Sequence, residues 1–280
     1  SDKLITSGRY EIYNTGHPQE DYFNMYRIDD KSDLKEAVLY VDYKTNIREH
    51  NMAAAGREAG CGFSKSFVES FLCSDGFPIS LSNKYLGDET MRKETANRDP
   101  RLKQLILTND FPTNVTDDLK DSTFVVNEDE FITQHCFTGY RPIKGFNPIY
   151  SQALYMKSSF DGIAYRYAET LLINAEAKAE LNTITDADLD RTINQLRDRV
   201  GMPHLTVNVG FTDPKWPDWG YSLSPILQEI RRERCIELAG EGFRFNDLKR
   251  WKAGKVLNNV LTYVGKRKPD GNLAIVYPNY

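Results

Sequence analysis

The chain has 280 residues, of which 40% are hydrophobic and 27% charged, as in a globular protein of one large or two ordinary domains. Its net charge of −4 provides no general attraction to nucleic acid or anionic lipid, so a nucleic-acid partner would require a local basic patch. No apolar run approaches the length of a membrane-spanning helix. Because the first residues contain no Met and begin no element, we expect the chain to be part of a longer precursor.

The composition changes near residue 150. Residues 1–150 show little helical periodicity and many Gly, Pro, Asn and Asp turn signals, which predicts long irregular loops. β-Branched and aromatic residues predict a strand over Glu36–Tyr43. Residues Lys65–Leu72 fit a short helix, and the following SDGFPI sequence indicates a turn.

Residues 151–280 instead show helical patterns. Apolar residues recur at three- and four-residue steps from Ile163 to Leu181, and several are Ala, which allows a second helix to approach closely. Thr185 and Asp188 form a capping-box-like start to one further helix, which Gly201 and Pro203 would end. This helical hairpin has the size of a TPR unit. Since one unit cannot bury its own apolar face, we expect its partners in an N-terminal part outside this chain.

A third helix is predicted after position 223. Ser224 and Pro225 are favoured residue types at the N-cap and at the first helical position. Gly240 and Gly242 should interrupt this helix, and the sequence FNDLKRW predicts a short further helix.

Charged residues are dense in the segment Ile230–Trp251, which holds six basic and four acidic residues. The two signs alternate, whereas a nucleic-acid-binding surface would cluster Lys and Arg. Helical spacing predicts the pairs Arg234–Glu237, Glu241–Arg244, Arg244–Asp247 and Asp247–Arg250. We therefore interpret the segment as a set of ion pairs that holds one helix against its neighbours.

Several motifs occur in an order that resembles the SusD/RagB family of outer-membrane nutrient-binding lipoproteins. The strongest are RYAE at Arg166–Glu169, an Asn-x-Leu-Arg sequence at Asn194–Arg197, and the long charged segment Glu233–Trp251. Further likenesses are NRDPRL at Asn97–Leu102, FVESFLCSDGFPI at Phe67–Ile79 and TGY at Thr138–Tyr140. The resemblance covers nearly the whole chain, as one continuous unit that lacks the N-terminal helical half of the family.

The resemblance implies a mainly α fold in which TPR-like hairpins form an α/α superhelix, with long irregular loops and little β structure. It also implies a cell-surface protein, anchored in the outer membrane through an N-terminal lipidated cysteine that is absent here. Such a protein would deliver glycans, or in some cases peptides, to a SusC-like TonB-dependent transporter, without catalysis. The residues assigned to the structural ion-pair motif are Arg166, Glu169, Arg197, Glu233, Arg234, Glu237, Glu241, Arg244, Asp247 and Arg250.

The sequence offers no convincing catalytic or cofactor site. The four histidines are scattered and form no zinc motif, so we expect no metal. The GREAGCGFSKS sequence is not a phosphate loop, because Lys65 follows Ser64 rather than Gly. The four cysteines, Cys61, Cys73, Cys136 and Cys235, lie far apart, and we expect free thiols rather than two disulfides.

Two loops combine aromatic and polar residues in the manner of sugar-binding surfaces. The first contributes Tyr43, Asn46, Arg48, His50 and Arg57, and the second contributes Trp216, Trp219 and Tyr221. In the second loop the Trp residues stand beside Pro and Gly just before an N-cap, so a hydrophobic plug is the competing interpretation. Non-catalytic glycan binding is the function we predict. Peptide or other nutrient binding, a glycan hydrolase with two loop carboxylates and a purely structural TPR-type adaptor are the alternatives.

Overall fold

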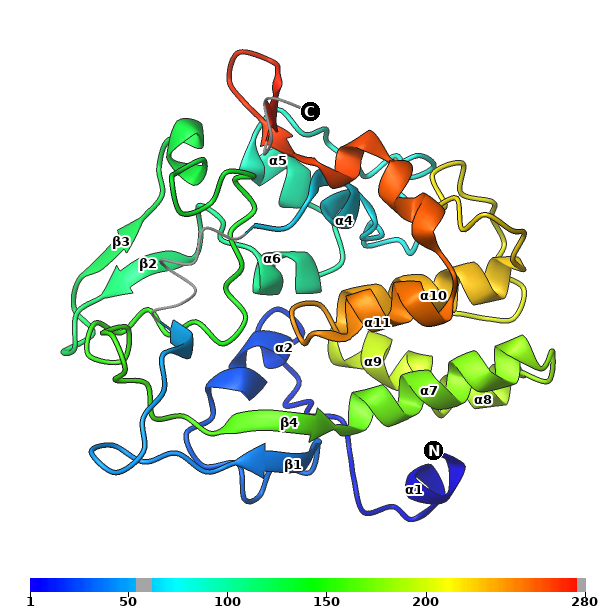
Figure 1. Ribbon diagram of the computed structural model, residues 1–280, viewed down its shortest axis with the longest axis horizontal. Helices are drawn as coiled ribbons and strands as arrows, with labels where there is room; N and C mark the ends of the chain where they lie inside the picture. Colours follow the sequence, from blue (N-terminus) through cyan, green and yellow to red (C-terminus); the bar gives the residue numbers. More distant parts are fainter. Residues whose placement is uncertain (54–61, 276–280) are drawn as a thin grey trace.

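The computed structural model describes residues 1–53 and 62–275, so Arg57 and Cys61 lie outside the described residues. Helices dominate, and the few strands are short and paired in two-stranded sheets (Figure 1). The helices are α1 Asp2–Thr6, α2 Asp21–Asn24, η1 Met25–Arg27, α4 Lys65–Glu69, α5 Met91–Thr95, α6 Arg101–Leu105, η2 Glu128–Phe131, α7 Tyr167–Glu180, α8 Asp186–Asp190, α9 Ile193–Arg199, α10 Pro225–Glu237, α11 Phe243–Arg250, η3 Gly254–Asn258 and η4 Val260–Thr262. The strands are β1 Ala37–Val41, β2 Pro112–Val115, β3 Ser122–Phe124, β4 Gly162–Arg166, β5 Val264–Arg267 and β6 Leu273–Ile275. About a third of the chain is helical and the strands are few and short, so the predicted excess of helix over strand is confirmed.

The predicted strand exists as β1, and it pairs with β4 in antiparallel fashion, with Ala37 opposite Arg166 and Val41 opposite Gly162. The prediction that a helix begins at Ile163 is therefore wrong, because residues 162–166 are extended. The backbone N–H of Tyr167 donates to the carbonyl of Glu36 at 2.8 Å, just where β4 becomes α7. Pairing with β1 satisfies backbone groups that a longer helix would otherwise have satisfied.

The remainder of α7 agrees with the sequence, since its Ala residues at 168, 175 and 179 are buried. The capping box of Thr185 and Asp188 is present. The single helix predicted after it is nevertheless wrong, because α8 and α9 are separate helices. They are interrupted at Thr192, whose φ of −132° and ψ of −93° are not helical and whose hydroxyl donates to the carbonyl of Asp188 at 2.6 Å. This side-chain bond to the backbone competes with helix continuation, as Thr often does.

The helix predicted after position 223 is confirmed as α10. The Ser224 side chain accepts a hydrogen bond from the backbone N–H of Leu227, and Pro225 is the first helical residue. Gly240 and Gly242 have φ values of +75° and +84°, a conformation that only Gly adopts without strain, and they separate α10 from α11. The two helices therefore meet at a sharp turn and not as one long rod.

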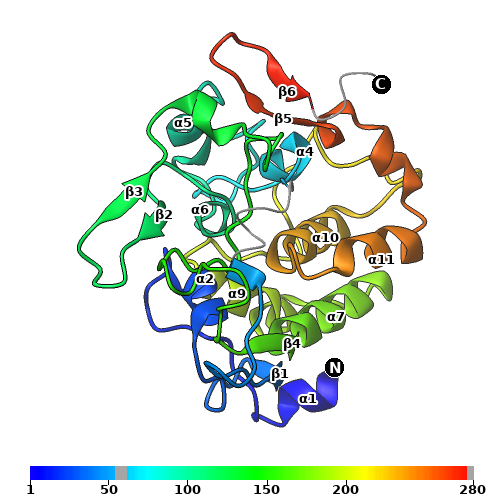
Figure 2. The same ribbon diagram turned by 60° about the vertical axis from the view of Figure 1, so that its left-hand side comes forward.

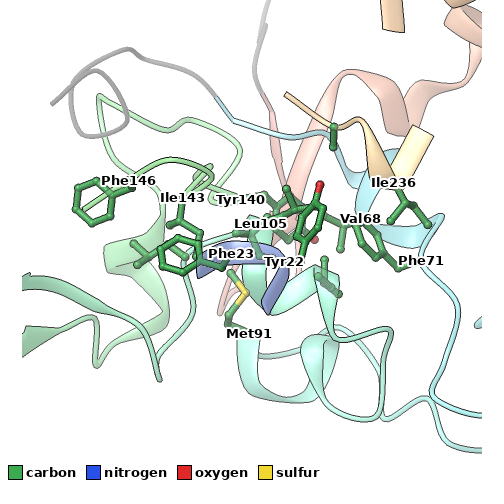
Figure 3. Close-up of a cluster of buried hydrophobic side chains, with 14 of the residues drawn as sticks. Tyr22, Phe23, Val68, Phe71, Met91, Leu105, Tyr140, Ile143, Phe146 and Ile236 are labelled. Carbon is green, nitrogen blue, oxygen red and sulfur yellow. The ribbon is translucent and has the colours of Figure 1, made fainter. Parts of the chain in front are cut away.

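Two main apolar clusters hold the fold together. The larger one, part of which Figure 3 shows, gathers Tyr22 and Phe23 of α2, Val68 of α4 and Leu105 of α6 around Ile236 of α10. The second lies between α7, α9 and α10. The first cluster includes residues from either side of position 150, and the partly buried Ile5, Tyr10, Ile12 and Val38 pack against the second, so the two compositional regions pack together. None of the described helices is both long and apolar enough to cross a membrane.

Candidate ligand-binding surface and buried ion-pair network

The first predicted ligand loop leaves β1 and turns tightly between Lys44 and Arg48, where Asn46 adopts a φ of +63°. The Tyr43 ring makes an edge contact with His50 at 4.5 Å between ring centroids. The guanidinium of Arg48 lies 5.0 Å from the Tyr43 centroid. The structure thus brings together four of the five residues predicted for this loop, and only Arg57 lies outside the described residues.

His50 has a structural role in this loop. Its Nε2 lies 2.8 Å from the carbonyl of Phe160, and its Nδ1 accepts the backbone N–H of Met52 at 3.1 Å. One nitrogen donates and the other accepts, which requires the neutral ring. Burial lowers the pKa of His50 in agreement with this assignment. The ring therefore fixes Tyr43 and is not poised as a proton carrier.

The loop lies against residues 149–159, which the sequence analysis did not single out. Asn51 accepts the backbone N–H of Met156 at 3.0 Å, and the Lys157 ammonium pairs with Glu49 at 3.2 Å. On this second segment Tyr150 is 51% exposed and Tyr155 is 72% exposed. The turn-rich sequence PIYSQALYM interleaves aromatic with polar residues, and this pattern could have marked the segment as a candidate binding loop. We call the six residues Tyr43, Asn46, Arg48, His50, Tyr150 and Tyr155 the Tyr43 surface.

The second predicted loop contains both buried and accessible residues. Trp219 is 3% exposed, contacts Trp251 edge to face at 5.5 Å and donates its N–H to Gln228, so it fits the plug interpretation. Trp216 is half-buried, and its N–H donates to the buried Glu229 at 2.7 Å. Tyr221 is 43% exposed, and its hydroxyl donates to the carbonyl of Trp251 at 2.5 Å. Trp216 and Tyr221 can therefore touch a ligand without unfolding, whereas Trp219 is packed inside.

The charged motif residues lie mainly inside the protein, in a network that spans the chain. Arg166 Nη1 contacts Glu36 at 2.9 Å and Glu237 at 2.6 Å, and both of its other nitrogens also have acceptors. Five cations meet five carboxylates, so the network is neutral. Its members are Arg101, Lys144, Arg166, Arg197 and Arg199 with Glu36, Asp99, Glu233, Glu237 and Glu241.

Three of the four helical pairings predicted from spacing are wrong, and only Asp247–Arg250 is confirmed, at 2.8 Å. Arg234 pairs with Asp247 at 2.9 Å, because the turn at Gly240 and Gly242 brings α11 back alongside α10. The structure pairs Glu241 with Arg166 and Lys144. Arg244 lies near the rings of Trp219 and Trp251, at 5.9 and 6.0 Å. Neither Arg244 nor Glu169 forms an ion pair with any residue that the structure describes.

The electrostatics of the network depend on its arginines. Burial alone would raise the pKa of Glu237, but the guanidinium groups of Arg199, Arg166 and Arg101 outweigh it and hold that pKa well below its usual range. Burial opposes ionisation of Glu241 in the same way, while Arg166 and Lys144 lower its pKa to about 2. The charges of this set balance, although Nε and Nη1 of the buried Arg199 have no hydrogen-bond partner among the described residues. Buried and paired in this way, the network fixes chain geometry. Of the thiols, Cys73 and Cys235 are free, and Cys136 is buried.

Comparison with known proteins gives a consistent result. The sequence model described as "SusD family" matches residues 11–274. A SusD-like carbohydrate binding protein from Bacteroides fragilis NCTC 9343 has a similar structure, with a TM-score of 0.67 and 23% identity over 98% of this chain and 54% of that one. A second SusD-like protein from the same organism has a TM-score of 0.64 and 24% identity over 90% of this chain and 50% of its own. The chain thus spans about half the length of these relatives. No curated protein matches the sequence.

Proposed function

Because the chain belongs to the SusD family, we propose that it binds glycans at the cell surface without converting them. One relative of the same fold is described as a carbohydrate binding protein, which supports this ligand class. The observation that carries the proposal is the Tyr43 surface, where the half-buried Tyr43 ring lies beside the Arg48 guanidinium on a loop tied to the segment that carries the exposed Tyr150 and Tyr155.

The chemistry of that surface suits a saccharide. Tyr rings offer apolar faces to sugar C–H groups, and their hydroxyls, with Asn46 and Arg48, can exchange hydrogen bonds with sugar hydroxyls. The ring of Tyr43 is held by His50 and Arg48, so little conformational entropy is lost on binding. Tyr155, at 72% exposure, would lose the most solvent contact under a bound chain.

We further propose the partners that the family resemblance implied. These are a SusC-like TonB-dependent transporter and an N-terminal lipid anchor in the outer membrane, with α7 to α9 belonging to a TPR-like superhelix. Peptide or other nutrient binding by the same surface is the second candidate function. A hydrolase is disfavoured because the buried carboxylates that we identified are paired with arginines. A purely structural adaptor is disfavoured by the exposure of Tyr150 and Tyr155.

The test is affinity electrophoresis of this chain through gels containing a panel of polysaccharides, followed by titration calorimetry on the best ligand. Tyr155→Ala and Tyr43→Ala should weaken binding roughly five- to thirtyfold, the effect expected of losing one anchoring aromatic. Tyr263→Ala is the matched control, since Tyr263 is 45% exposed and directly precedes β5, which Figure 2 shows at the opposite end of the molecule from β1.

Two results would reject the proposal. The first is an absence of binding to every glycan by a chain that retains its circular dichroism spectrum. The second is an equal loss of affinity in all three Tyr variants, because the Tyr43 surface would then contribute nothing specific. Release of reducing ends during long incubation would instead favour the hydrolase.

A further inference from the structure

A pocket of about 670 Å³ lies between α7, α10 and the end of α11, a volume typical of small-molecule sites. Figure 2 shows the three helices side by side. The pocket is separate from the Tyr43 surface. Gly162, at the start of β4, lies beside Tyr43, whereas the pocket begins at Ile173, near the middle of the following helix α7.

Cations dominate the lining of this pocket. It contains Arg231, Arg234, Arg250 and Lys252, against the two carboxylates of Glu176 and Glu180. The two anions are already engaged. Glu176 accepts both terminal nitrogens of Arg250, at 2.5 and 2.6 Å, and Glu180 accepts Nη2 of Arg231 at 3.0 Å. Asp247, outside the lining, pairs with Arg234 and Arg250, so the three arginines are balanced by three carboxylates and Lys252 supplies one net positive charge.

Hydrogen-bond donors in the pocket wall also lack acceptors. Nε of Arg231 and Nη1 of Arg234 are buried and have no partner among the described residues, although the two side chains are only about 3% and 5% exposed. A buried guanidinium nitrogen without an acceptor is costly. The exposed Lys252 forms no ion pair with the described residues, so its ammonium is also available. The exposed Lys252 ammonium is therefore the accessible cation for an anionic ligand, whereas the two guanidinium nitrogens have almost no solvent access.

Aromatic rings supply an apolar side to the same pocket. Tyr221 is 43% exposed, and Nη1 of Arg231 donates to its hydroxyl at 2.9 Å. The guanidiniums of Arg231 and Arg250 both lie close to the Trp251 ring, with their central carbons 4.5 and 4.6 Å from its centroids. The Trp251 N–H donates to Glu176, so both the aromatic and the charged parts of the wall are fixed before any ligand arrives.

We propose that this pocket binds the carboxylate of an acidic sugar, with the sugar ring against Tyr221 and the carboxylate near Lys252 and the arginines. The inference deepens the proposed function and rests on it for the ligand class, because a planar carboxylate matches guanidinium geometry and an aromatic face matches a sugar ring. The group that the pocket would recognise is a carboxylate, and an acidic side chain of another polypeptide would offer the same group.

The test compares a glucuronate-terminated oligosaccharide with its neutral glucose-terminated counterpart by calorimetry at low salt. The acidic sugar should bind about tenfold more tightly, and the preference should shrink at high salt. Lys252→Met removes one charge while keeping the stem, and it should abolish most of that preference. Lys249→Met is the matched control, because Lys249 is exposed on α11 outside the pocket and lies over the Phe245 ring.

Equal affinity for the two sugars, or an unchanged preference in Lys252→Met, would overturn the pocket assignment. If Tyr155→Ala lost acidic-sugar binding and Lys252→Met did not, the acidic sugar would bind at the Tyr43 surface. That result would support the proposed function and reject this inference. Binding of a glutamate-rich peptide but not of the acidic sugar would reject the sugar as the occupant. Failure of both sugars and of all neutral glycans would reject the proposed function itself.

Discussion

Replacing Glu237 by Gln should test whether the buried ion-pair network determines the stability of this protein. The Glu237 carboxylate contacts Nη2 of Arg199 at 2.6 Å, Nη1 of Arg166 at 2.6 Å and Nη1 of Arg101 at 3.0 Å. All four side chains are at most 1% exposed. The substitution preserves shape, but among the described residues it removes the one negative charge that all three arginines share.

The expected loss is large for two reasons. Removing one partner of a buried ion pair typically costs about 3–5 kcal/mol, because the other charge is left without compensation. The new amide group also adds N–H donors in a place surrounded by donors. Against a total stability of about 5–15 kcal/mol for an ordinary domain, this single change removes about a fifth of the stability or more.

Urea unfolding monitored by tryptophan fluorescence measures the effect as a shift in midpoint at constant slope. The matched control is Glu11→Gln, because Glu11 pairs with Lys35 at 3.0 Å with both side chains more than 60% exposed. That pair should contribute no more than about 1 kcal/mol. If Glu237→Gln lost no more stability than Glu11→Gln, the network would not carry the energetic role assigned to it.

Three further predictions concern stability. The pKa of Glu241 is lowered from 4.5 to about 2, so its ionisation contributes roughly 3 kcal/mol to folding stability above pH 4.5. That contribution is lost as the pH falls toward 2. Urea midpoints of a Glu241→Gln variant should therefore depend less on pH in the acid range than those of the unchanged protein. Trp219→Ala should cost about 3–5 kcal/mol in thermal unfolding, and a change below 1 kcal/mol would argue against the plug interpretation. Gly242→Ala should cost about 1–2 kcal/mol through its φ of +84° alone, since nothing lies within 4 Å of the added carbon. Gly254→Ala, which is equally open but has no positive φ, should be neutral or slightly stabilising, and equal urea midpoints for the two variants would contradict the strain argument.

Local signals predicted several elements correctly. The strand at β1, the cap of α10 at Ser224 and the capping box at Thr185 each depend on a few neighbouring residues, so the sequence was sufficient to find them. The start of α7 was misjudged, because residues 162–166 have a helical apolar pattern yet pair with a strand more than 100 positions earlier. The break at Thr192 was missed because a side-chain bond to the backbone leaves no mark in apolar periodicity.

The candidate binding residues were predicted in part. Tyr43, Asn46, Arg48 and His50 lie together because they follow one another in a single loop. The segment that carries Tyr150 and Tyr155 is tied to this loop by a hydrogen bond from Met156 to Asn51 and an ion pair of Lys157 with Glu49, about 100 residues apart, which spacing could not indicate. Trp219 and Tyr221 differ by two positions, yet one is buried and the other exposed, because Trp251 packs on the first and leaves a face of the second open.

The sequence by itself determined the family, the helical character and the alternation of charges over Ile230–Trp251, since these are properties of residue order. Only the tertiary structure decided which charges meet. A helical spacing of three or four residues predicts a neighbour on the same helix, but burial makes an unpaired charge so costly that the arginines of the network are matched to whichever carboxylates the fold brings near. Arg166 therefore meets Glu36 and Glu237, and Arg231 and Arg234, which pair only in part, are left to line a pocket.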